Sequence, residues 1–108
     1  PGEFEQMVLL AIVRMGERAF ALEVRRTLEE RAGRSVSRGA FYTTLDRLES
    51  KGMVEWQEAE PEDSRRSQPL RRFTVTPRGR EALLQARRAM DSLWQGLDHL
   101  LDPAGGRP

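Results

Sequence analysis

Arginine is the residue type with the most evident chemistry in this 108-residue sequence, and it is concentrated in two places. In the first, Arg38 and Arg47 flank Tyr42 and Thr43, just after Ser37. The second lies farther along the chain and contains two adjacent pairs, Arg65, Arg66, Arg71 and Arg72. A guanidinium group offers a fork of N–H donors that fits phosphate oxygens and the guanine edge. Both places therefore predict binding to nucleic acid, without predicting a reaction.

The rest of the composition argues against catalysis. The sequence has no cysteine, and His99 is its only histidine, so neither a metal site nor a cysteine nucleophile is expected. It has no Ser-His-Asp set, no glycine-rich phosphate loop and no HExxH motif. We expect a protein that is not an enzyme and uses no cofactor. The longest apolar run, Met7 to Val13, is too short to cross a bilayer, so we expect a cytoplasmic protein without a membrane partner.

Net charge alone does not support nucleic-acid binding, because the formal charge is only +1. The argument depends instead on where the charges lie. Lys51 is the only lysine among 18 basic residues, and a GC-rich genome would explain that bias equally well. Each arginine segment also has a second interpretation, as the solvated face of an ordinary helix or as a salt-bridged hairpin.

The periodicity of apolar residues predicts the elements that would carry these arginines. Apolar residues recur at helical spacing in three early segments, then alternate in two short ones, and return to helical spacing at the end. The expected elements are helices at 3–15, 19–32 and 38–51, strands at 54–57 and 70–76, and a helix from 77 to about 101. In the second helix Leu22, Val24 and Leu28 should be buried.

This order predicts a mainly α fold with a small β-hairpin, a winged helix-turn-helix followed by a long C-terminal dimerisation helix. The expected divisions are a DNA-binding domain at 1–76, the dimerisation helix at 77–102 and a disordered tail at 103–108.

The third helix is the candidate for reading DNA. Ser37 should cap it, and Phe41, Leu45 and Leu48 should point inward at i, i+4 and i+7. This leaves four candidate DNA contacts on the outer side, Arg38, Tyr42, Thr43 and Arg47. Arg38 is the best candidate for a bidentate contact with guanine, while Ser37 and Tyr42 suit phosphate.

The last helix has an apolar seam with alternating steps of three and four, the spacing of a heptad repeat. One small domain cannot cover so long a seam, so we expect a homodimer in which the first helix also takes part. The expected interface residues are Phe4, Met7, Val8, Ala11, Leu83, Met90, Leu93, Trp94, Leu97, Leu100 and Leu101. Packing of the seam on the same chain's first helix is the alternative. Trp94 also leaves open a site for a small aromatic effector.

Three segments resemble the PadR family of transcriptional regulators. Residues 39–54 read GAFYTTLDRLESKGMV, residues 71–79 read RRFTVTPRG, and residues 8–12 read VLLAI. The chain departs from the family pattern in having Ala19-Phe20-Ala21 where Ala-Tyr-Gly is frequent, and Phe41 where leucine or valine is frequent. Its C-terminal part resembles the short subgroup with a single C-terminal helix.

The resemblance implies a winged-helix homodimer that binds a pseudo-palindromic operator in double-stranded DNA and represses transcription. Two other functions stay open at this point. One is a winged helix that binds proteins and not DNA; the other is a ligand-sensing dimer with an aromatic pocket near Trp94.

Overall fold

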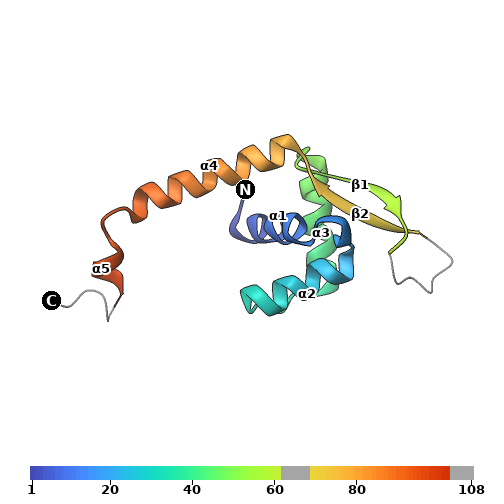
Figure 1. Cartoon of the computed structure of the whole chain (residues 1–108), viewed down its shortest axis with the longest axis horizontal. Helices are drawn as coiled ribbons and strands as arrows, with labels where there is room; N and C mark the ends of the chain where they lie inside the picture. The colour runs from blue at the N-terminus through green and yellow to red at the C-terminus, as the bar shows by residue number, and fades with distance from the viewer. Residues whose placement is uncertain (62–68, 103–108) are drawn as a thin grey trace.

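Three helices form the body of the protein in the computed structural model, which describes residues 1–61 and 69–102 (Figure 1). They are α1 (Glu3–Met15), α2 (Ala21–Ala32) and α3 (Arg38–Ser50), with a short 3₁₀ turn, η1 (Gly16–Arg18), after the first. Phe41, Leu45 and Leu48 are buried on one face of α3, as their spacing predicts. They share a core with Val8, Leu9 and Ile12 of α1 and with Val24 and Leu28 of α2.

The prediction for the second helix was wrong at its start and on one side. Ala19 and Phe20 are not helical, because they lie beside the hairpin. The amide of Phe73 donates a hydrogen bond to the Ala19 carbonyl at 2.9 Å, and Phe20 forms a β-bridge with Arg72. Leu22, expected in the core, is 52% exposed, since the core-facing side of α2 carries Val24 and Leu28.

The two expected strands form an antiparallel hairpin, here called the wing. β1 (Val54–Ala59) pairs with β2 (Leu70–Val75), from Val54 opposite Val75 to Ala59 opposite Leu70. The buried residues Val54, Phe73 and Val75 fix the base of the wing to the core. The predicted arginine tip, with Arg65 and Arg66, lies outside the described residues, as does the tail expected at 103–108.

The last helix begins as predicted but ends early. α4 (Pro77–Trp94) is capped by Thr76, whose side chain accepts from the Gly79 amide at 3.1 Å. The chain then breaks at Gln95 and Gly96 and continues as the short helix α5 (Asp98–Leu101). The single helix to Leu101 was therefore wrong, because Gln95 is extended at ψ 123° and Gly96 has φ +81°. Figure 1 shows α4 extending past α1, away from the wing.

The fold class is nonetheless as expected: a mainly helical chain with a two-stranded antiparallel hairpin. In residues 1–61 and 69–102, no helix has both the length and the apolar character needed to cross a membrane.

Candidate nucleic-acid interface

The start of α3 is fixed by the cap that the sequence predicts. Ser37 has extended backbone angles, and its Oγ accepts a hydrogen bond from the Ala40 amide at 3.2 Å. The other amides of the first turn have no partner within the helix and give its N-terminus a partial positive charge. The hydroxyl hydrogen of Ser37 stays free to donate in addition. This end of the helix is therefore suited to a phosphate oxygen.

The outer face of α3 carries all four predicted contact residues, because Arg38, Tyr42, Thr43 and Arg47 are exposed. The Arg38 guanidinium lies 5.7 Å from the centre of the Tyr42 ring. Tyr42 in turn meets the buried Phe41 edge to face, with ring centres 5.6 Å apart. Core packing thus holds Tyr42, and Tyr42 supports Arg38, which limits the directions in which this long side chain can point.

Asp46 lies on the same exposed side of the helix, and the sequence argument overlooked it. Its spacing of i+4 from Tyr42 and i+3 from Thr43 was the signal that could have placed it there. A carboxylate repels phosphate but can accept from the amino group of cytosine. The face therefore offers both donors and acceptors, which suits the edges of bases better than a surface of cations alone.

The wing is connected to α3 through Trp56. Its Nε1 donates to Glu49 Oε1 on α3 at 3.2 Å, and the Arg71 guanidinium covers the Trp56 ring at 4.1 Å from its centre. Trp56 therefore lies between α3 and Arg71. The stacked guanidinium keeps its N–H edges available, because only its flat face is used by the ring.

Arg71 and Arg72 do not act as a pair, although they were predicted together. Successive residues of a strand point to opposite faces, and the two arginines follow that rule. Arg71 shares the Trp56 face, whereas the half-buried Arg72 lines a cavity of about 360 Å³ with Glu17 and Arg80. Glu58 is directly opposite Arg71 in the hairpin, so the acidic strand lies beside the basic one.

The joint between the wing and the helices depends on Gly79, which the sequence argument did not single out. A Cβ there would collide with the Met53 carbonyl oxygen and lie 2.7 Å from Val75 Cγ1. Thr76 completes the joint, because its Oγ1 donates to the Gly52 carbonyl at 2.6 Å and its amide donates to that of Met53 at 3.0 Å. The end of α3, the wing and the start of α4 therefore meet at one close-packed point.

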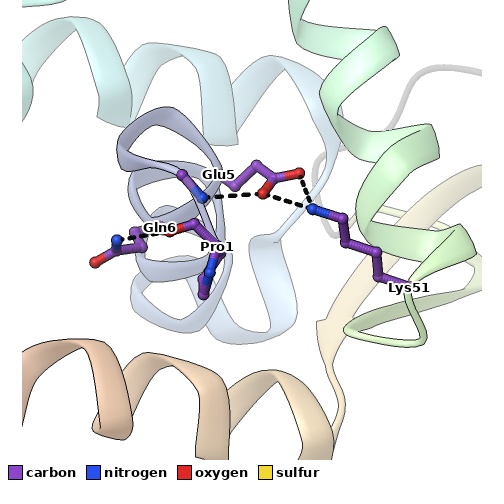
Figure 2. A network of polar contacts seen from close by, with 5 residues as sticks. Pro1, Glu5, Gln6 and Lys51 are labelled. Atoms are coloured by element: carbon purple, nitrogen blue, oxygen red, sulfur yellow. Dashed lines mark hydrogen bonds and ion pairs between the residues drawn. The ribbon is translucent and has the colours of Figure 1, made fainter.

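Lys51 is held on the protein's own surface. Its Nζ donates to both carboxylate oxygens of Glu5, at 2.9 and 3.0 Å, and the Gly2 amide also donates to Glu5 (Figure 2). The Lys51 ammonium lowers the pKa of Glu5 from its ordinary value, against the opposing effect of burial. This ion pair joins α1 to the end of α3, so the only lysine has a structural role.

The residues predicted to form a dimer interface divide into three groups by burial. Val8 and Ala11 belong to the core of the protomer, where they are 0% and 4% exposed, so they present no surface to a partner. Phe4, Met7 and Leu83 are partly buried against the core. The exposed members are Met90, Leu93, Trp94, Leu97, Leu100 and Leu101. On α1, the exposed apolar residues are instead Leu10 and Val13, at 56% and 54%.

Trp94 lies at the bend between α4 and α5. It lines an open hollow of about 720 Å³ with Arg88, Asp91, Ser92, Gln95 and Asp98. Apart from Trp94, these neighbours are polar or charged. Within the part of the chain that the structure describes, no cluster of three or more histidine and carboxylate side chains could hold a metal ion.

The comparisons with known proteins agree with this architecture. The model of the family described as "Transcriptional regulator PadR-like family" matches residues 9–85, which include the helix-turn-helix, the wing and the start of α4. The chain belongs to the PadR-like family. Two of the three segments whose residues resemble PadR proteins fall wholly within this range.

Solved PadR-like structures have the same fold. A PadR-like transcription factor of Bacteroides fragilis is 22% identical, with a TM-score of 0.70 over 90% of this chain and 88% of the other. A PadR family transcription regulator of Clostridium difficile R20291 is 17% identical, with a TM-score of 0.71 over 92% and 99%. RosR of H. salinarum is 26% identical, with a TM-score of 0.65 over 89% and 79%. Curated proteins gave no significant match.

As a member of this family, the protein is a DNA-binding transcriptional regulator with a winged helix-turn-helix.

Proposed function

We propose that the protein is a homodimeric repressor that binds a pseudo-palindromic operator in double-stranded DNA. In this proposal α3 enters the major groove with its N-terminal half and Arg38 reads a guanine. Ser37 and Tyr42 donate to phosphates, and Thr43 and Arg47 contact the groove farther along. Repression follows from occupying DNA that RNA polymerase would otherwise use.

The single observation that carries the proposal is the outer face of α3. A capped helix N-terminus, a guanidinium supported on a tyrosine ring and further polar side chains lie together on it. Arg71, on the face of the wing that Trp56 ties to α3, can reach a backbone phosphate beside the groove. Arg72 points the other way, so we leave it out of the proposed contact.

The apolar surface of the C-terminal helices supports the homodimer. Leu93 is 72% exposed and Leu100 is 68% exposed. A large apolar patch of this kind on a soluble protein marks a surface that binds a partner. Leu10 and Val13 of α1 add a second apolar strip, which replaces Val8 and Ala11 in the proposed interface. A twofold dimer would give two recognition helices, as the two halves of a palindrome require.

A footprint and gel shift on the DNA upstream of the protein's own gene test the proposal. The wild type should protect two half-sites about one helical turn, roughly 34 Å, apart. Arg38→Ala should weaken specific binding about 5- to 100-fold, as expected when one bidentate base contact is lost. Arg88→Ala is the matched control, because Arg88 is exposed on α4 and pairs with Glu81 at 3.2 Å. Equal binding by all three proteins would contradict the assignment of α3.

A small aromatic effector is a second proposal, favoured by the 45% exposure of Trp94 in its hollow. Such a ligand should quench the fluorescence of Trp94 and not that of Trp56. In a Trp56→Phe protein the quenching should therefore persist, and in a Trp94→Phe protein it should vanish. Quenching that survives Trp94→Phe would exclude this site.

A further inference from the structure

A chain of side-chain contacts runs from α3 through Trp56 to the arginine of the wing that is proposed to reach phosphate. It begins at Glu49, one residue before the end of α3, whose Oε1 accepts from the indole Nε1 of Trp56 at 3.2 Å. It ends at Arg71, whose guanidinium lies over the indole ring, 4.1 Å from its centre. Glu49, Trp56 and Arg71 come from α3, β1 and β2, so the contacts cross from the recognition helix to the far strand of the wing.

The Trp56 ring is itself held by the fold. It packs, partly buried, against the hydrophobic core, and Phe73, directly opposite it in the hairpin, is 6% exposed. A tryptophan side chain has only two torsions, so packing and one hydrogen bond leave it little freedom. The ring therefore offers Arg71 a platform whose position is fixed relative to α3.

Arg71 is held on this platform without being neutralised. Glu58 is directly opposite it in the hairpin, yet Arg71 takes part in no ion pair among the residues that the structure describes. The ring uses only the flat face of the guanidinium, and the side chain remains exposed. Its charge and its N–H edges are thus available to an anion outside the protein.

We propose that Trp56 determines specificity for the operator without touching DNA, because it makes the phosphate contact of Arg71 and the base contact of Arg38 require the same orientation of α3. The inference rests on the contacts proposed above for Arg38 and Arg71. It adds a positioning role for Glu49 and Trp56.

The argument concerns the difference between a free and a fixed arginine. Phosphates are present on every DNA sequence, so an arginine that moves freely finds one in whatever orientation α3 adopts. An arginine fixed relative to α3 meets its phosphate only when α3 lies in the groove in one orientation. On the operator the contact of Arg38 with guanine maintains that orientation, and on other sequences no base contact does. The wing contact then favours the operator, although phosphate carries no sequence information.

Fixing Arg71 in the free protein also removes a cost of binding. A long side chain that is ordered only in the complex loses conformational entropy on association, whereas one that is already restricted does not. The saving occurs once in each protomer of the proposed dimer. It should amount to about 5-fold or more in operator affinity.

A double-variant cycle on the operator found by the footprint measures the coupling of the two contacts. Arg38→Ala and Arg71→Gln together should weaken binding by about 5-fold or more less than the product of their separate effects. In a Trp56→Leu background the two effects should simply multiply. Effects that multiply in the wild-type background would overturn the coupling while leaving both DNA contacts in place. Single variants that bind like the wild type would overturn the proposed contacts as well.

A comparison of the operator with a random-sequence duplex of the same length separates positioning from folding. Trp56→Leu should lower operator affinity by about 5-fold or more and leave affinity for the random duplex unchanged, because Arg71 keeps its charge. The salt dependence of operator binding should also persist, whereas Arg71→Gln should reduce it. An equal loss on both duplexes would mean that Trp56 acts only through folding, and the proposal would fail.

Glu49 provides the matched pair of variants for the hydrogen bond. The conservative variant Glu49→Gln keeps an oxygen that accepts from Trp56 Nε1, so the ratio of operator to random affinity should be retained. Glu49→Ala removes the acceptor and should lower that ratio. Glu30→Ala is the control for loss of a negative charge, because Glu30 is exposed on α2, outside the chain of contacts. Equal ratios for Glu49→Ala and Glu30→Ala would show that the hydrogen bond does not position the wing, and would overturn the role of Glu49 and Trp56.

Discussion

Among the glycines that the structure describes, Gly79 leaves the least space for a Cβ. An alanine there should lower the free energy of unfolding by about 1–3 kcal/mol, because its Cβ has no space against Met53 and Val75. Its better helix propensity offsets only part of that cost. Gly39→Ala is the control: Gly39 is also helical, but a Cβ there would meet nothing within 4 Å. Urea unfolding should show a lower free energy of unfolding for Gly79→Ala and no loss for Gly39→Ala. Equal effects would mean that Met53 and Val75 leave space for a Cβ at position 79.

The Glu5–Lys51 ion pair predicts a dependence of stability on pH. Because folding lowers the pKa of Glu5, the pair stabilises the fold above the ordinary glutamate pKa, about 4.3, and this contribution is lost as pH falls through the lower folded value. At pH 6 Glu5→Gln should therefore be less stable than the wild type, by about 0.5–1 kcal/mol because Lys51 is half exposed. As pH falls through the lowered pKa of Glu5, the stabilities of the two proteins should converge.

Lys51→Met provides the reciprocal test of that pair. It should lose the same increment at pH 6, and the double variant should lose no more than either single variant. Additive losses in thermal unfolding would show that Glu5 and Lys51 act separately.

At the scale of elements, the sequence predicts those helices whose apolar residues recur because they face the core. Phe41, Leu45 and Leu48 recur at helical spacing because they face one core, and that core exists in the protomer. The start of α2 was not predictable in this way, since Ala19 and Phe20 are kept out of the helix by β2, which lies beside them. The end of α4 was missed for another reason: its heptad spacing continues past a glycine whose conformation the spacing does not report.

The candidate site shows the same division. The exposed residues of α3 follow from its helical period, so Arg38, Tyr42, Thr43 and Arg47 could be found from the sequence. The separation of Arg71 from Arg72 also follows from the sequence, because successive residues of the predicted strand point to opposite faces. The stacking of Arg71 on Trp56 depends instead on the register of the hairpin. That register is fixed by burial of Phe73 and Val75, which only the folded chain displays.

The cap of α3 links stability to recognition at this scale. Ser37→Ala removes the acceptor of the Ala40 amide and should cost about 1 kcal/mol of folding stability. It should also weaken DNA binding, because the first turn becomes less ordered and loses a phosphate donor. Ser37→Asp restores the cap but adds a negative charge beside the phosphate. Recovered stability with binding still poor would separate the two roles, whereas recovery of both would leave Ser37 with the cap alone.

For the molecule as a whole, the number of protomers bound to DNA can be obtained from the dependence of DNA affinity on salt concentration. Each cation that neutralises a phosphate contributes about 0.9 to the slope of log affinity against log salt. Arg71→Gln keeps much of the side chain over Trp56 but removes its charge. If a dimer binds with both wings, this one substitution should flatten the slope by about 1.8; a single bound copy would give about 0.9.

Arg88→Ala should leave the slope unchanged, because α4 lies outside the proposed contact. An unchanged slope for Arg71→Gln would mean that this part of the wing does not reach phosphate. A change of half the expected size would instead leave the wing in place and remove the second protomer from the complex.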